Sequence, residues 1–98
     1  MKYNLQLSLL AQEQSDRAYV YYQTQKSGLG DRFLDRLEET LNLLAENPYL
    51  FALRHGPVRF AGVEDFPYVV HYQVEGWDVV VVGVVNSYQN PETWITGE

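Results

Sequence analysis

Apolar and polar positions alternate most clearly in the second half of the chain, where they predict a β-hairpin. Between residues 68 and 75 every second side chain is a tyrosine or a valine, as in a strand with one buried face. Residues 79–85 are valines except for Gly83, so this second strand is apolar on both faces and is expected in the interior of a sheet. Gly76 lies between the two runs and suits a tight turn.

The first half of the chain has the pattern of one strand followed by two helices. Every second residue of 3–7 is apolar, and Ser8 then suits a helix N-cap. Small and aromatic residues recur at helical spacing from Leu9 to about Lys26, and Gly28 favours the left-handed conformation that ends a helix. A second helix is predicted from near Gly30 to Asn47-Pro48, with an apolar stripe of Phe33, Leu34, Leu37, Leu41 and Leu44.

The remaining elements complete an α+β domain that spans residues 1–98. Residues 57–61 predict a short strand, and the element order is therefore βααβββ. Two helices joined by about three residues must form an antiparallel hairpin, which we expect on one face of a mainly antiparallel sheet. The segment 49–56 has no clean period, and its apolar side chains are expected to pack under the helix ends: Tyr49, Leu50, Phe51 and Leu53.

Composition narrows the function classes. The 98 residues include no cysteine and only two histidines, so we expect no disulfide, metal site or cofactor. There is no charged-then-apolar leader and no apolar run of about 18 residues, which predicts a cytoplasmic protein without a membrane anchor. Seven Lys plus Arg against 13 Asp plus Glu give a net charge of −6, and this disfavours direct nucleic-acid binding.

Six short fragments follow one another along nearly the whole chain: YY at Tyr21-Tyr22, GLGDRFLDRLE from Gly28, ENP from Glu46, VRF from Val58, FPYVVHYQV from Phe66 and NPETW from Asn90. In this order and spacing they resemble the RelE/ParE toxin superfamily of bacterial type II toxin-antitoxin modules, often labelled plasmid stabilisation proteins. The resemblance implies two helices packed against a curved antiparallel sheet. It also implies a cognate antitoxin whose disordered tail wraps the toxin.

Members of this superfamily act in two ways, and the cations of this chain favour one of them. RelE-like members resemble metal-independent ribonucleases, whereas ParE-like members bind a protein target, DNA gyrase. Many relatives carry basic or histidine residues at positions where this chain has Gln73, Asn86 and Gln89, and Arg59 is its only Arg or Lys from His55 onward. The ParE-like interpretation, a toxin that binds a protein and is not an enzyme, is therefore preferred.

Two alternatives remain open at this point. A RelE-like mRNA endonuclease would need a proton acceptor, a proton donor and cations around the reacting phosphate. The groups available for that chemistry are Arg54, His55, Arg59, His71 and Tyr88. The third hypothesis is a degenerate, non-toxic member of the family that only binds its antitoxin.

The ParE-like interpretation places the recognition residues beside the most apolar strand, because rigid scaffolds that present short loops are where binding residues gather. We expect one target-binding cluster made of Arg59, Asn86, Tyr88, Gln89 and Trp94. Tyr21, which falls off the core stripe of the first helix, is the candidate for antitoxin contact. Apolar surface left bare near the helix ends or on the second face of the sheet would be covered by the antitoxin or a second copy, giving a hetero-oligomer or homodimer.

Overall fold

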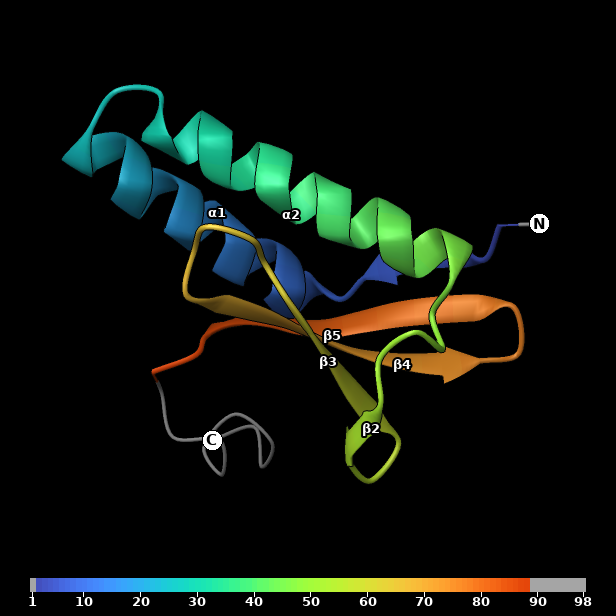
Figure 1. Cartoon of the computed structure of the whole chain (residues 1–98). Coiled ribbons are helices and arrows are strands. Elements are labelled where there is room, and N and C mark those ends of the chain that lie inside the picture. Colours follow the sequence, from blue (N-terminus) through green and yellow to red (C-terminus); the bar gives the residue numbers. More distant parts are fainter. Residues whose placement is uncertain (1, 89–98) are drawn as a thin grey trace.

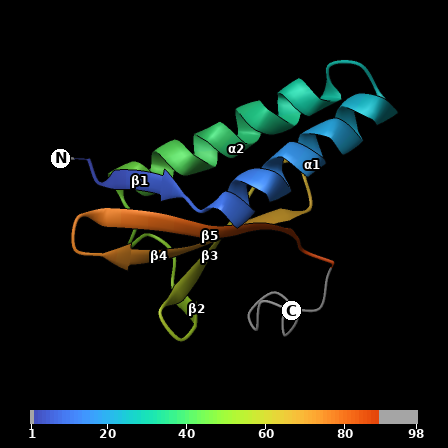
Figure 2. The same cartoon turned by 180° about the vertical axis from the view of Figure 1, so that it is seen from behind.

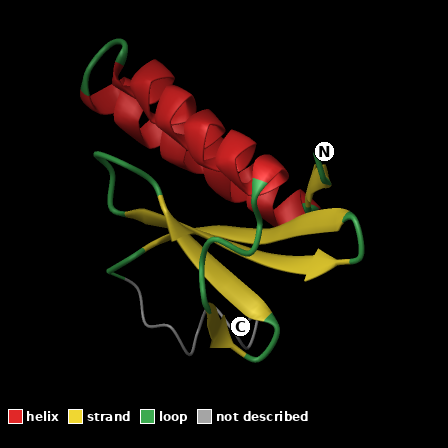
Figure 3. Ribbon diagram, turned by 45° about the vertical axis from the view of Figure 1, so that its right-hand side comes forward, coloured by secondary structure: helices red, strands yellow, loops and turns green. Residues whose placement is uncertain are grey.

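The computed structural model describes residues 2–88, which fold into a layer of two helices over one sheet (Figure 1). The elements in chain order are β1 (Asn4–Leu7), α1 (Leu9–Gln25), α2 (Leu29–Glu46), β2 (Leu53–His55), β3 (Val58–Gly62), β4 (Tyr68–Glu75) and β5 (Asp78–Asn86). Viewed from the side, both helices lie on the same face of the strands (Figure 3). The predicted α+β class and the helical hairpin on one face are confirmed.

The sheet has the strand order β1-β5-β4-β3-β2 and is antiparallel except at one pair. The hairpin of β4 and β5 turns through Gly76, which has a φ of 61°. The valine-rich β5 lies between β4 and β1, so its predicted interior position is confirmed. β1 runs parallel to β5 and pairs with its first half, Asp78 to Val81, after which the chain leaves the sheet and α1 passes over β5 (Figure 2).

The helical hairpin is held by the residue types that predicted it. The Ser8 hydroxyl accepts a hydrogen bond from the Ala11 N–H at 3.0 Å, which confirms the N-cap. Gly28 has a φ of 89° and separates the helices, so α2 begins at Leu29, one residue before the expected start. The two helices lie close together at Gly30, where an added Cβ would lie 2.6 Å from the Tyr19 carbonyl oxygen. Only glycine fits this contact.

An aromatic cluster joins the helices to the sheet. The rings of Tyr22 from α1 and Phe33 from α2 lie 5.6 Å apart, and both meet Phe66 and Tyr68 from the sheet side at centroid distances of 4.8 to 6.1 Å. Phe33 is fully buried. Clustered rings of this kind contribute about 0.5–1.5 kcal/mol per pair beyond the area that they bury.

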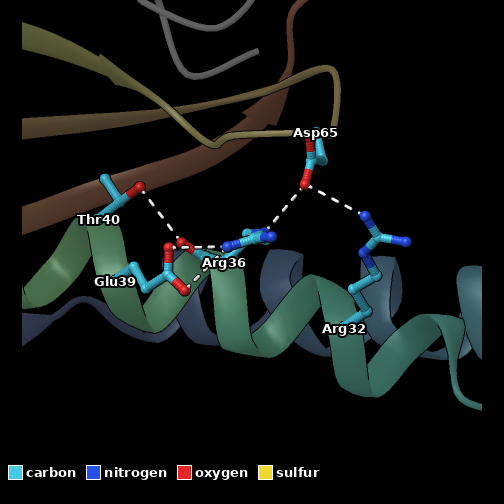
Figure 4. Close-up of polar contacts among 5 residues, drawn as sticks. All are labelled: Arg32, Arg36, Glu39, Thr40 and Asp65. Atoms are coloured by element: carbon cyan, nitrogen blue, oxygen red, sulfur yellow. Dashed lines mark hydrogen bonds and ion pairs between the residues drawn. The ribbon is translucent and has the colours of Figure 1, made fainter.

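Two ion pairs fasten the loop between β3 and β4 to α2 (Figure 4). The Asp65 carboxylate accepts from Arg36 Nε at 3.0 Å and lies 3.4 Å from Arg32. Asp65 has a φ of 70°, a left-handed conformation that Asp tolerates better than most residues. Beside it, the Thr40 hydroxyl donates to the Gly62 carbonyl at 3.2 Å. The loop that carries Phe66 into the aromatic cluster is thereby fixed.

The segment after α2 departs from the expectation. Instead of a packed connection alone it contains β2, a three-residue edge strand paired with β3, and the element order is βααββββ. Tyr49, Leu50 and Leu53 are exposed, and only Phe51 packs against the core. Because β2 lies at the edge of the sheet, beyond the reach of the helices, its side chains have nothing to pack under. Leu34, assigned to the apolar stripe of α2, is also exposed.

Candidate target-binding surface

The end of β5 holds the two predicted recognition residues that the structure describes. Asn86 is the last residue of β5 and pairs with Tyr68, and Tyr88 follows two positions later with 86% of its surface exposed. The Asn86 side-chain oxygen accepts a hydrogen bond from the Tyr88 N–H at 2.9 Å, which fixes the turn after the strand. Gln89 and Trp94 lie outside the described residues.

Arg59 does not lie beside these residues, so that part of the expected cluster is wrong. Its strand, β3, is separated from β5 by β4, and Arg59 pairs with Tyr72 whereas Asn86 pairs with Tyr68. Four residues of β4 correspond to about 13 Å along the strand. The Arg59 guanidinium instead donates to the Phe51 carbonyl at 2.6 Å and lies 5.0 Å from the centre of the Tyr49 ring. It anchors the segment after α2.

His71 is a buried residue of β4. It is 4% exposed, and its ring stacks on Phe60 with centroids 4.1 Å apart and an angle of 7° between the planes. Burial lowers the pKa of His71 from its ordinary 6.5 to about 4, because the charged imidazolium is penalised away from water. The imidazole is therefore neutral at pH 7 and is not the cationic acid that would protonate a leaving group.

The five residues considered for RNA cleavage do not meet at one place. Arg59 shares a register position with the core residue Tyr72, on the face that the helices cover, whereas His71 is the next residue along β4 and lies on the opposite face. Arg54 and His55 lie on the exposed edge strand β2, and Tyr88 follows the far end of β5. Within residues 2–88 no three His, Asp or Glu side chains are grouped to hold a metal ion.

Comparison with known proteins identifies the family. A family model described as "ParE toxin of type II toxin-antitoxin system, parDE" matches residues 5–91. The chain belongs to the ParE toxin family. Among solved structures, a chain titled "Chromosomal ParDE TA system from P. aeruginosa" is similar with a TM-score of 0.77 and 16% identity, over 87% of this chain and 96% of that one. At this identity the likeness is one of fold. No curated protein matches the sequence.

The sequence did not point to one further feature of this ParE-family chain, a cleft between α1 and the end of β5. It has a volume of about 170 Å³ and is lined by Gln14, Arg17, Tyr68, Val84, Val85 and Asn86. The Gln14 side-chain oxygen accepts from the Val84 N–H at 2.8 Å, at the place where β1 no longer pairs with β5. Asn86 is thus shared between the predicted recognition segment and this cleft.

Tyr21 of α1 is exposed as expected, and its ring lies 5.2 Å from that of Tyr22. Its role in antitoxin contact stays a prediction. Other bare apolar residues lie near the helix ends and on the loops, among them Leu9, Leu10, Tyr49, Leu50 and Trp77. In the described part of the chain neither helix is long and apolar enough to cross a membrane.

Proposed function

We propose that this ParE-family chain is the toxin of a type II toxin-antitoxin module, that it acts in the cytoplasm by binding DNA gyrase, and that a cognate antitoxin holds it inactive. Membership of the ParE family supports the toxin assignment. The partner assignment is supported by the solved neighbour, whose title describes a ParDE toxin-antitoxin system. Nothing in this proposal requires a cofactor.

The observation that carries the choice of a protein target is the separation of the groups that RNA cleavage would need. Attack of a 2′-hydroxyl on the adjacent phosphate requires a base, an acid and cations within hydrogen-bond reach of one phosphate. His71 is buried and neutral, and Arg59 is engaged by the Phe51 carbonyl on the other face of the sheet. A binding surface needs no such convergence, and the exposed Tyr88 at the end of a rigid strand suits one.

The decisive experiment measures two activities of the same purified protein. We expect inhibition of DNA supercoiling by purified gyrase and no cleavage of mRNA, whether free or on ribosomes. Cleavage that disappears in Arg59→Ala or His71→Ala would overturn the proposal in favour of a ribonuclease.

A second experiment locates the binding surface. The double substitution Tyr88→Ala with Gln89→Ala should abolish growth inhibition when the chain is expressed without antitoxin. It should leave the melting temperature nearly unchanged, since Tyr88 is 86% exposed and substitution of such a side chain shifts stability by about 0.5 kcal/mol or less. Leu53→Ala, which truncates a residue 56% exposed on the edge strand β2, is the matched control and should stay toxic.

The outcomes separate the remaining possibilities. A folded double variant that stays fully toxic would show that the recognition surface lies elsewhere, and Tyr21 on α1 would be tested next. A wild-type chain that is harmless at good expression, yet binds the product of the neighbouring gene, would establish the non-toxic alternative. Failure to bind that product would remove the antitoxin from the proposal.

A further inference from the structure

The cleft between α1 and β5 forms where a side chain, instead of β1, pairs with the backbone of β5. β1 pairs with β5 only as far as Val81, and α1 then passes over the remaining half of β5 (Figure 2). Beyond that point the Gln14 side-chain amide lies at the edge of β5 and accepts a hydrogen bond from the Val84 N–H. The cleft opens between this amide and the last residue of the strand, Asn86.

The hydrogen bonds already made in the cleft determine what it can still bind. Gln14 uses its side-chain oxygen on the Val84 N–H, and Asn86 uses its side-chain oxygen on the Tyr88 N–H. A backbone N–H can bond only to the oxygen of an amide, so both side chains are oriented and each keeps its NH₂ group as a donor. Both amides therefore offer donors to a ligand.

Arg17 adds a positive charge to these donors. It is exposed and forms no ion pair with any residue of 2–88, whereas Arg32 and Arg36 on α2 are both paired with Asp65. The remaining polar residue of the lining is Tyr68, and no carboxylate residue lines the cleft. With two amide NH₂ groups and a guanidinium around about 170 Å³, the cleft is complementary to an anionic group that accepts several hydrogen bonds.

We propose that this cleft binds the carboxylate of an acidic side chain on a partner protein. A phosphate of nucleic acid has the same hydrogen-bonding needs, but strands of phosphates are bound by several cations, and here one arginine faces the cleft in a chain of net charge −6. The proposal does not depend on gyrase being the target.

The neighbouring residues of α1 indicate what flanks that carboxylate. Leu10, Gln14, Arg17 and Tyr21 recur at spacings of four, three and four residues, which places them along one stripe of the helix. Leu10 and Tyr21, at the two ends, are 51% and 57% exposed. A partner segment with apolar side chains on both sides of an Asp or Glu would cover the two apolar ends while its carboxylate enters the cleft.

NMR titration of the ¹⁵N-labelled full chain tests this directly. The probes are the capped pentapeptide acetyl-Leu-Ala-Glu-Ala-Leu-amide, whose Leu and Glu side chains share one face when it is extended, and its neutral isostere acetyl-Leu-Ala-Gln-Ala-Leu-amide. We expect the Glu peptide to shift the side-chain NH₂ signals of Gln14 and Asn86 in a saturable way, and the Gln peptide to bind about tenfold more weakly, as loss of a charge-assisted hydrogen bond implies. Arg17→Gln should weaken binding of the Glu peptide by a similar factor.

The control variant is Arg54→Gln, which removes another exposed arginine without an ion pair in residues 2–88, from the far edge of the sheet. It should leave binding unchanged. Equal effects of Arg17→Gln and Arg54→Gln would reduce the result to general electrostatics and overturn the proposal. Equal binding of the Glu and Gln peptides, no shift of the two amides, or stronger shifts with a single-stranded oligothymidylate than with the Glu peptide would overturn it as well.

Discussion

Acidification should destabilise the fold because His71 is buried, and the size of the effect can be calculated from its lowered pKa. The imidazole is 4% exposed and stacked on Phe60, and burial lowers its pKa to about 4. In the unfolded chain the same group has its ordinary pKa of 6.5. As the pH falls, the unfolded chain therefore takes up the proton first.

The sign and size of the effect follow from this difference in pKa. The stabilisation is fully present above pH 6.5 and is lost progressively as the pH falls from there toward about 4. In that interval the free energy of unfolding falls by up to about 1.4 kcal/mol per pH unit. Between pH 7 and pH 5 the loss from this one histidine amounts to about 2 kcal/mol.

Urea unfolding at pH 7, 6 and 5 measures the loss when wild type is compared with His71→Phe. Phenylalanine keeps an aromatic ring against Phe60 and has no proton to take up, while the carboxylates of the chain titrate alike in both proteins. The stability of wild type relative to the variant should fall by about 2 kcal/mol over these two units. Parallel pH dependences would refute the reasoning, because they would mean that the imidazole titrates alike in the folded and unfolded chain.

Four further substitutions, one of them a control, test individual contacts that hold the fold. Gly30→Ala should lower the free energy of unfolding by about 1–3 kcal/mol, despite a gain of about 1 kcal/mol in helix propensity, since the new Cβ meets the Tyr19 carbonyl. Gly62→Ala, where the space around the added Cβ is open, should leave the free energy of unfolding nearly unchanged. Thermal unfolding of the two glycine variants measures the difference. Asp65→Asn should lower the free energy of unfolding slightly, through loss of its two ion pairs with α2, and the difference from wild type should shrink in 1 M NaCl. Ser8→Ala should cost about 1 kcal/mol by removing the cap of α1, and unchanged urea midpoints would contradict that role.

The parts of the fold with regular hydrophobic periods could be predicted from the sequence. The β4 and β5 hairpin and both helices were recognisable because each buries one face or stripe continuously. β2 was missed because its three residues are all exposed, so no alternation marks it. Arg32 sits three positions from Asp35 in the sequence, yet it pairs with Asp65 across the fold. The spacing of charges along one helix does not predict an ion pair with a residue from another part of the fold.

The candidate site was predictable only in part, for a similar reason. Asn86 and Tyr88 could be singled out because they follow the most apolar strand. Gln14 and Arg17 gave no signal, since Gln14 meets its partner Val84 across 70 positions of sequence. Arg59 was assigned to the wrong neighbours because the sequence predicts the strand but not the register in which it pairs with β4.

The pairing of β1 with β5 also sets the order in which the chain can mature during synthesis. Asn4 to Leu7 leave the ribosome first, but their partners Asp78 to Val81 follow 74 positions later. Until then β1 has no strand beside it, and the face that α1 and α2 bury has no β5 to pack on. Contacts of such long sequence separation form late, because the intervening loop must close before they contribute. A product that terminates anywhere before β5 is therefore expected to expose core residues and be a substrate for proteolysis, so toxicity would require nearly the whole domain to be translated.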